Sequence, residues 1–499
     1  MCSNHKPFLP ISLLLPALCL LCACSAHVQQ AELLHRPAPV WPDYTGVTVP
    51  CNLAPPRFAL PDSCLLDRVQ AVFAAGSEQC VQTTGSNGIA IGMEDWHRLC
   101  EASDTVMVRI QGRQAGRWVE YDPFCIYVSA DSINPYLAYR LIEPGHEIWH
   151  KIQLCQRNLE TYEETAFLDN NWSGGTCMNC HSFHRYSPQT MLLHMRRDYG
   201  GTYVLRDGQV ERLNTKTPEI ISALVYPSWS SSGRFVAFST NSTKQGFHST
   251  DRNRVEVFDL ASDVVVYDVE RHCIFSCPRL QSRAAFETFP VFAPDDRAIY
   301  FCSADSVPMP EQYDSVHYSL CRIAFDPDAA MAGRYSDAFG QQVDTLYDAT
   351  ARGGSISFPR VSPDGHYLLY THSSYGNFSI WHRDADLRMT DLRTGRDVDV
   401  SALCSPETES YHSWSSNSRW VVISTRRDDG LYTRLYLAHV DSVGHCSKPT
   451  PLPQEGALHD LRLMKSYNIP EFVDDPVSAG PDFVEAARTQ PGTDLQFAH

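Results

Sequence analysis

The segment FPRVSPDGHYLLYTH, residues 358–372, places a turn sequence between two stretches that resemble strands. Pro363 presets the backbone φ angle of the turn, and Asp364 and Gly365 accept its tight geometry. The residues after the turn include the apolar run of a buried or half-buried strand. The segment therefore predicts a strand, a tight turn and a second strand.

This pattern occurs four times in the C-terminal two thirds of the chain. Each copy begins with an aromatic residue followed by Pro or His, and the copies begin at Tyr226, Phe289, Phe358 and Tyr411. They lie 63, 69 and 53 residues apart, which leaves room for a further strand pair after each copy. A four-stranded sheet cannot bury both of its faces alone, so several are expected to close into a β-propeller. An open β-sandwich is the alternative.

The predicted fold class is mainly β. Residues 41–165 alternate like short strands and predict an N-terminal β domain, and residues 200–450 predict a C-terminal propeller of about five to seven blades. The segment GGTYVLRDGQVERLN, residues 200–214, indicates a partial blade that closes the ring. Residues 451–499 predict a helical or irregular tail packed on the propeller, and residues 166–199 a short helical segment between the two domains.

The N-terminus is typical of an exported bacterial lipoprotein. Lys6 is followed by the apolar run FLPISLLLPALCLLCAC, which predicts a signal peptide over residues 1–23. Its end, LCAC, resembles a lipobox with a lipid on Cys24, and residues 24–40 predict a Pro-rich tether. We therefore expect a periplasm-facing protein held to the membrane by its lipid anchor. The alternative is an ordinary secretory signal followed by an unmodified cysteine.

Charge and cysteine content limit the function further. The formal net charge of −17 argues against nucleic acid as a partner, because phosphates would be repelled. The chain has 18 cysteines, and an oxidising envelope compartment would permit disulfides among those beyond the leader. Free buried thiols are the alternative for several of them.

The segment CMNCH, from Cys177 to His181, has the CxxCH pattern that attaches c-type haem. On a helix, positions i, i+3 and i+4 share a face, so Cys177 and Cys180 could bond the two porphyrin vinyl groups while His181 binds the iron. One covalent haem c is therefore predicted in residues 166–199. A zinc site, a disulfide or two free thiols remain alternatives.

A second iron ligand is predicted downstream. Ser187 and Pro188 are a helix start signal, and a helix from Pro188 would place Met191, His194 and Met195 on one face. We predict His194 as the sixth haem ligand, with Met195 as the alternative. In the competing interpretation, the methionines are packing residues and His194 is merely hydrogen-bonded. An iron without a sixth ligand would suit a peroxidase or a sensor.

The string HEIWH, from His146 to His150, matches the H-E-x-x-H pattern of zinc metalloproteases. Such a site needs the motif inside a helix together with a third ligand, and Pro144 and Gly145 directly precede it here. Surface or core histidines are the alternative.

Two features together resemble a known family. The segments that begin YPSW resemble the PD40 (WD40-like) blades of TolB-like propellers, and CMNCHSF between a β domain and such blades resembles TolB-like cytochrome proteins of Bacteroidetes envelopes. LLHMRR followed by GGT belongs to the same resemblance. It implies a lipid-anchored monohaem cytochrome in respiratory electron transfer or cytochrome assembly, without identifying a partner. In an electron-transfer role, we expect a redox or envelope protein to dock on the propeller. The alternatives are a TolB-like binding scaffold with a structural or sensory haem, and an enzyme, either a haem peroxidase or a HEIWH metalloenzyme.

Overall fold

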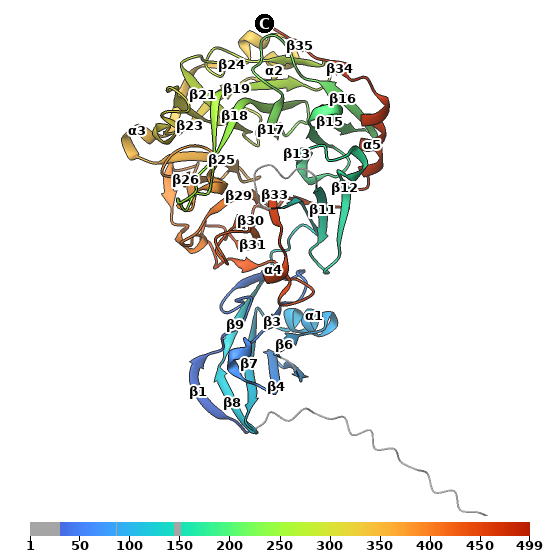
Figure 1. The fold of residues 1–499 in the computed structure, drawn as a ribbon, viewed down its shortest axis with the longest axis vertical. Helices are drawn as coiled ribbons and strands as arrows, with labels where there is room; N and C mark the ends of the chain where they lie inside the picture. The colour runs from blue at the N-terminus through green and yellow to red at the C-terminus, as the bar shows by residue number, and fades with distance from the viewer. Residues whose placement is uncertain (1–29, 86, 144–150) are drawn as a thin grey trace, which may run out of the picture.

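The computed structural model describes residues 30–85, 87–143 and 151–499, which form a small N-terminal domain and a six-bladed β-propeller (Figure 1). The predicted mainly β fold class, with an N-terminal β domain and a C-terminal propeller, is confirmed. Cys24 and the segment from His146 to His150 lie outside the described residues. None of the helices in the described ranges is long and apolar enough to cross a membrane.

The N-terminal domain is built on a seven-stranded sheet. Its strands are β1 (Glu32–Pro37), β2 (Thr48–Pro50), β4 (Arg68–Ala75), β5 (Glu78–Thr84), β7 (Thr105–Gln114), β8 (Arg117–Asp122) and β9 (Phe124–Ser129). Beside it lie a small sheet of β3 (Arg57–Ala59) and β6 (Gly88–Ala90), and helix α1 (Met93–Ala102). Residues 32–37, expected in a tether, instead form β1, which pairs in parallel with β8.

Blades 2 to 6 follow one another along the chain, each with four antiparallel strands. Blade 2 consists of β13 (Met178–Phe183), β14 (Met191–Met195), β15 (Gly201–Arg206) and β16 (Gln209–Asn214). Blade 3 consists of β17 (Leu224–Trp229), β18 (Phe235–Phe247), β19 (Val255–Asp268) and β20 (Cys273–Phe275). Blade 4 consists of β21 (Ala285–Phe292), β22 (Ala298–Asp305), β23 (Ser319–Phe325) and β24 (Phe339–Tyr347).

The remaining sequential blades have the same plan. Blade 5 consists of β25 (Ser355–Val361), β26 (Tyr367–Ser373), β27 (Asp386–Asp391) and β28 (Arg396–Val398). Blade 6 consists of β29 (Glu409–Trp414), β30 (Trp420–Thr425), β31 (Arg434–His439) and β32 (Thr450–Pro451). Short helices α2 (Pro327–Met331), α3 (Ala349–Arg352) and α4 (His459–Arg462) occupy connections.

Blade 1 joins the two ends of the propeller. It contains β10 (Tyr136–Ile142), β11 (Ile152–Asn158), β12 (Glu164–Asp169) and, as its inner strand, β33 (Ser466–Val473). The C-terminal segment also adds β34 (Thr493–Asp494) to blade 2, β35 (Gln496–Phe497) to blade 3, and helix α5 (Gly480–Thr489) against β12 and β16. Pairing the first and last segments removes the open edges of the ring.

The predicted domain boundaries are therefore corrected. The propeller begins at β10 and runs to the C-terminal segment, whereas we expected it over residues 200–450. The N-terminal domain ends before Tyr136 instead of at residue 165, and residues 451–499 close the ring instead of forming a tail. Since blade 1 is built from two distant segments, the sequence contains no contiguous copy of the repeat from which blade 1 could be predicted.

The helix expected in residues 166–199 is also corrected. The CMNCH segment runs into β13, and Met191, His194 and Met195 lie in β14. All five residues of β14 are buried, because an interior strand of a blade is covered on both faces. Such a strand carries no polar and apolar alternation, so its sequence is ambiguous between helix and strand.

The six inner strands share a bulge. Each has one residue in the left-handed region, with φ between 41° and 54°: Cys180, Tyr226, Phe289, Phe358, Tyr411 and Ile469. The pairing of each strand with its neighbour shifts register at this point. The rings of Tyr226, Phe289, Phe358 and Tyr411 contact one another in succession, at centroid distances of 4.5, 5.4 and 4.6 Å. We call these six residues the channel ring.

Candidate functional site

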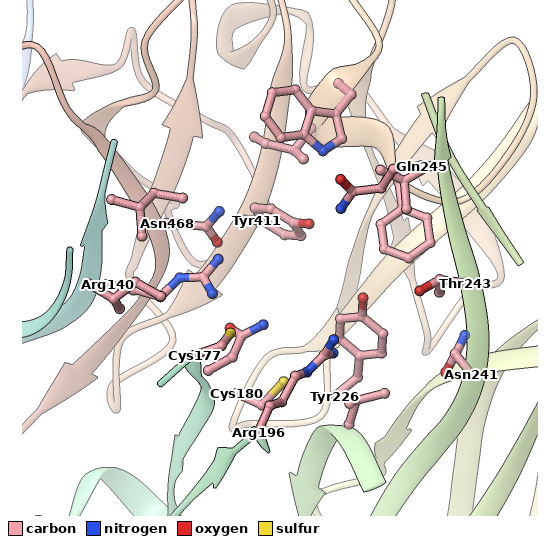
Figure 2. A pocket seen from close by; sticks show the side chains of 18 of the residues that line it. Arg140, Cys177, Cys180, Arg196, Tyr226, Asn241, Thr243, Gln245, Tyr411 and Asn468 are labelled. Atoms are coloured by element: carbon pink, nitrogen blue, oxygen red, sulfur yellow. The ribbon is translucent and has the colours of Figure 1, made fainter. Parts of the chain in front are cut away.

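The candidate site is the central channel of the propeller, which has a cavity on each side of the channel ring. The first cavity, of about 190 Å³, is bordered by Cys177 and by the ring residues Cys180, Tyr226 and Tyr411 (Figure 2). The second, of about 590 Å³, is bordered by residues that follow the ring positions along the inner strands. The two cysteines of the CMNCH segment thus face the channel.

The bulge at Cys180 explains how both cysteines border one cavity. In a regular strand, residues three positions apart point to opposite faces. Cys180 has a φ of 54°, and the pairing of β13 with β14 shifts between Asn179 and Ser182. This shift brings Cys180 to the cavity that Cys177 borders. His181 follows the bulge, and it is not among the residues that line this cavity.

His181 lies instead toward blade 1. Its side chain is 2% exposed, faces the backbone of Ile469, and has no hydrogen-bond partner for Nε2. Burial lowers the pKa of His181 to about 4, so the imidazole is neutral at neutral pH. The nitrogen lone pair that a metal would require is therefore available.

A second histidine occupies the same position in blade 6. The bulge aligns Cys180-His181-Ser182-Phe183 with Tyr411-His412-Ser413-Trp414. His412 Nε2 lies 3.0 Å from the carbonyl oxygen of Leu369, its Nδ1 has no partner, and burial lowers its pKa to about 3. A buried, neutral histidine at this position is thus a feature of the blade repeat. What distinguishes blade 2 is the pair of cysteines.

The two predicted sixth ligands lie elsewhere. His194 is 3% exposed, its Nδ1 lies 3.3 Å from Thr202 Oγ1, and it borders a separate cavity of about 550 Å³. Burial lowers the pKa of His194 to about 3. Met195 is fully buried in the core with Met178 and Met191. His194 and Met195 both border this separate cavity, and neither borders the cavity of the cysteines.

Two arginines supply positive charge to the first cavity. Arg140 of β10 and Arg196, directly after β14, both point their guanidinium groups into it (Figure 2). Among the residues that the structure describes, neither forms an ion pair, and Arg140 Nε is buried without a partner. Burial raises the pKa of the Cys180 thiol, while the positive charges of Arg196 and Arg140 lower it. The cavity therefore favours a negatively charged group.

The rest of the wall is aromatic and amide in character. Tyr226 and Tyr411 lie beside Phe378 and Trp381, and Asn241 and Asn468 each have a side-chain oxygen without a hydrogen-bond partner. The aromatic faces and guanidinium groups suit a flat molecule with acidic substituents, and the two amide oxygens can accept hydrogen bonds from it.

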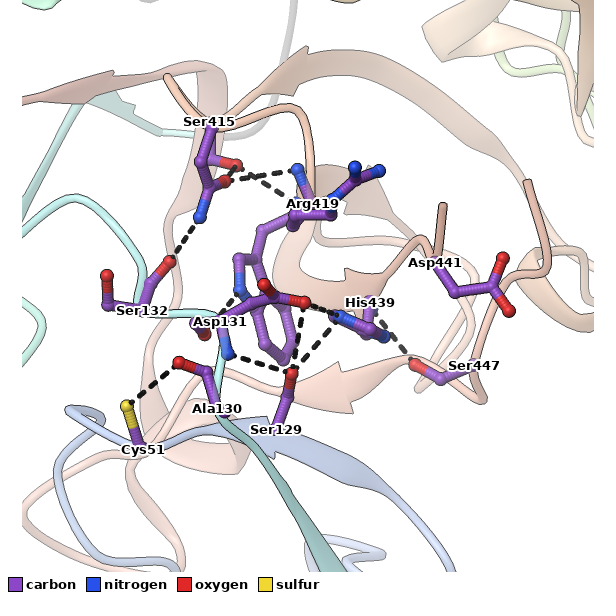
Figure 3. Close-up of polar contacts among 12 residues, drawn as sticks. Cys51, Ser129, Ala130, Asp131, Ser132, Ser415, Arg419, His439, Asp441 and Ser447 are labelled. Carbon is purple, nitrogen blue, oxygen red and sulfur yellow. Dashed lines mark hydrogen bonds and ion pairs between the residues drawn. The ribbon is translucent and has the colours of Figure 1, made fainter. Parts of the chain in front are cut away.

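A serine, a histidine and an aspartate also meet between the two domains (Figure 3). Ser129 Oγ and Asp131 Oδ2 lie 3.2 and 2.7 Å from the same atom, His439 Nε2. A catalytic relay needs the serine and the carboxylate on different nitrogens of the histidine. This group therefore anchors the N-terminal domain to blade 6, together with Trp420, whose Nε1 donates to the Asp131 carbonyl at 3.0 Å.

No group of three or more His, Cys, Asp or Glu side chains that could hold a metal ion occurs within the described ranges. The HEIWH histidines fall outside these ranges.

Sequence reasoning missed Arg140 and Arg196, because only closure of the ring brings β10 next to blade 2. It also treated CMNCH as separate from the blades. The sequence HSF after Cys180 matches HSW after Tyr411, and this match could have shown that the CMNCH segment begins a blade.

Comparison with known proteins identifies no family. No protein-family model and no curated protein sequence matches. A DUF4784 family protein from Bacteroides caccae is similar over 74% of this chain and 96% of that chain, at 10% identity and a TM-score of 0.29. Porphyromonas gingivalis dipeptidyl peptidase 4 is similar over 72% and 59%, at 9% identity and a TM-score of 0.28. A prolyl endopeptidase is similar at 12% identity and a TM-score of 0.34, over 64% of this chain, which spans 42% of that enzyme.

Proposed function

We propose that the protein is a monohaem c-type cytochrome on a propeller scaffold, with haem bonded to Cys177 and Cys180 at the first cavity. The observation that carries the proposal is that both thiols of the CMNCH segment border this cavity. In this role the protein would pass electrons to a redox or envelope protein docked on the propeller. Haem, once attached, supplies one-electron chemistry, and the chain supplies its position and electrostatic surroundings.

Three features of the site support this chemistry. The thiols are close in the chain, His181 is neutral with a free Nε2, and Arg140 and Arg196 could pair with the two propionates. Two features limit how it would fit. The cavity of about 190 Å³ is smaller than the roughly 300 Å³ lower limit of typical cofactor sites, so most of the macrocycle would lie outside it. Since His181 faces Ile469, its imidazole would have to turn to bind iron.

The decisive experiment measures covalent haem. Full-length protein, exported in a host with haem-attachment machinery, should keep one haem per chain after denaturing electrophoresis, by peroxidase staining and pyridine haemochrome absorbance. Cys177→Ala combined with Cys180→Ala should lose the haem, while Cys125→Ala, remote from the cavity, should keep it. Wild-type protein without covalent haem would refute the proposal.

The role of His181 can be separated from its place in the blade repeat. His181→Gln should keep covalent haem but lose the low-spin absorption spectrum, because the thioether bonds need only the cysteines. His412→Gln changes the equivalent position in blade 6 and should leave the spectrum unchanged. Identical spectra in both variants would assign His181 a purely structural role. His194 and Met195 remain predicted sixth ligands and can be tested in the same way.

The proposed location is the periplasm-facing surface of a membrane, with a lipid on Cys24. Labelled palmitate should be incorporated into wild-type protein and not into Cys24→Ala. Incorporation into the variant would place the lipid elsewhere.

A further inference from the structure

One residue from each blade lines the second cavity, two positions after each channel-ring residue. These residues are Ser182, Ser228, Val291, Arg360, Ser413 and Glu471. Four of them are small and uncharged, and two carry opposite charges. Arg360 and Glu471 lie on the inner strands β25 and β33, with blade 6 between them.

The two charged side chains influence each other without forming an ion pair. Burial lowers the pKa of Arg360, and Glu471 opposes this effect. Burial likewise raises the pKa of Glu471 to about 7, and Arg360 opposes that shift. Yet no nitrogen–oxygen contact of 4.0 Å or less joins these two described residues. Arg360 and Glu471 are both half-buried residues, and both border the cavity.

Arg360 is held in place by its own strand. Its guanidinium group lies 4.2 Å from the centre of the Phe358 ring, and Nη1 donates to the carbonyl oxygen of Pro359 at 3.0 Å. The guanidinium group is therefore positioned before any ligand arrives, which lowers the entropic cost of binding.

The Glu471 carboxyl group can accept more hydrogen bonds than the one that joins blades 1 and 2. Its Oε2 accepts the Phe183 N–H at 3.1 Å, a bond that joins blade 1 to blade 2. At the equivalent place between blades 3 and 4, Ser228 Oγ accepts the Phe292 N–H at 3.1 Å. Since a serine hydroxyl satisfies this bond, the charge of Glu471 and its second oxygen are not needed for blade packing.

Aromatic residues also border the cavity: Trp229 is half-buried, whereas Trp414, Phe292 and Phe472 are no more than 4% exposed. The volume of the cavity, about 590 Å³, lies in the range of small-molecule sites. The channel ring lies at the inner end. Two further charged residues border the cavity, the exposed Arg185 and Asp474, and Asp474 already accepts a hydrogen bond from Asn134 Nδ2. The half-buried pair Arg360 and Glu471 thus supplies a cation and a carboxyl group beside room for a side chain.

We propose that this cavity binds a free α-amino acid with a large apolar side chain. Arg360 would bind the carboxylate, Glu471 the ammonium group, and the half-buried Trp229 the side chain. The serine hydroxyls are available for further hydrogen bonds. This site is separate from the first cavity and does not depend on haem.

Titration calorimetry of the full-length protein with L-phenylalanine tests the proposal. L-Phenylalanine should bind, whereas N-acetyl-L-phenylalanine and L-phenylalaninamide should each bind at least about tenfold more weakly, because each lacks one charge. The proposal is overturned if L-phenylalanine does not bind, or if both blocked compounds bind as well as it does.

Two variants assign each charge to its partner. In Arg360→Met, amidation of the ligand should no longer weaken binding, and in Glu471→Gln, acetylation should no longer weaken it. The amide introduced by Glu471→Gln keeps an oxygen for the Phe183 N–H, so this variant is expected to fold. Arg396→Gln changes an exposed arginine of blade 5 that does not border the cavity and should preserve both preferences. If Arg360→Met and Glu471→Gln keep both preferences as well, the assignment is wrong.

Discussion

Cys180 is a non-aromatic member of a largely aromatic channel ring. Tyr226, Phe289, Phe358 and Tyr411 supply rings at the equivalent positions of blades 3 to 6. A thiol at this place leaves space beside Tyr226 and Tyr411, where the first cavity lies. One residue choice in one copy of the repeat therefore leaves room for a cavity and places a thiol at its border.

A buried carboxyl group should make stability depend on pH. Glu287 in β21 is 2% exposed, and burial raises its pKa to about 8, with Asp263 acting in the same direction. Between pH 4.5 and 8 the folded chain retains a proton that the unfolded chain releases, so stability falls as pH rises through this window. The free energy of unfolding of Glu287→Gln should therefore exceed that of wild type by about 1–3 kcal/mol at pH 8.5 and equal it at pH 5.

Urea unfolding at the two pH values measures this difference. Glu311→Gln changes an exposed carboxyl group and should follow the wild-type pH dependence. If Glu287→Gln also follows it, the Glu287 carboxyl does not carry the raised pKa.

At the scale of elements, the four copies of the strand–turn–strand pattern allow the propeller to be predicted. Blades 1 and 2 lack this pattern, and each lacks it for a different reason. Blade 1 is split between β10–β12 and β33, which lie about 300 residues apart in the chain. In blade 2, Cys180 replaces the aromatic residue that marks the other copies, so the CxxCH pattern concealed the repeat. Ser187 and Pro188 suggested a helix start, but tertiary burial on both faces made β14 a strand.

The candidate site was predictable only in part. The spacing of Cys177, Cys180 and His181 predicted them as site residues, and the structure places the two thiols at the first cavity. The sequence could not place His181 on the side of the strand away from the thiols, since that depends on the bulge at Cys180. Arg360 and Glu471 are single charges in unrelated blades, and only the closed ring places them around one channel.

The contact between α5 and blade 1 depends on a glycine. A Cβ atom at Gly480 would lie 1.7 Å from the carbonyl oxygen of Phe167, which is backbone of β12 and cannot move aside. Gly480→Ala should therefore displace α5 and lower the free energy of unfolding by at least about 2 kcal/mol. Gly456→Ala, where a Cβ meets nothing within 4 Å, should leave stability unchanged. Thermal unfolding followed by circular dichroism distinguishes the two, and equal melting temperatures would show that α5 adapts without cost.

At the scale of the whole molecule, the two domains share one apolar core. The core of the N-terminal domain includes Trp420, Val422, Leu435 and Leu437 of blade 6. Trp420 is fully buried, and its indole lies 4.8 Å from the His439 ring of the interdomain anchor. The two middle strands of blade 6, β30 and β31, thus bury side chains in the core of the N-terminal domain.

The shared core predicts that both domains unfold together. Calorimetry of the full chain should show one transition, because neither domain can expose its half of the core without the other. Trp420→Ala should lower the free energy of unfolding by about 3–5 kcal/mol and shift that transition as a whole. Val443→Ala, at a side chain in blade 6 that is 76% exposed, should leave it in place. Two separate transitions in the wild-type protein, with only one of them moved by Trp420→Ala, would show that the domains are energetically independent.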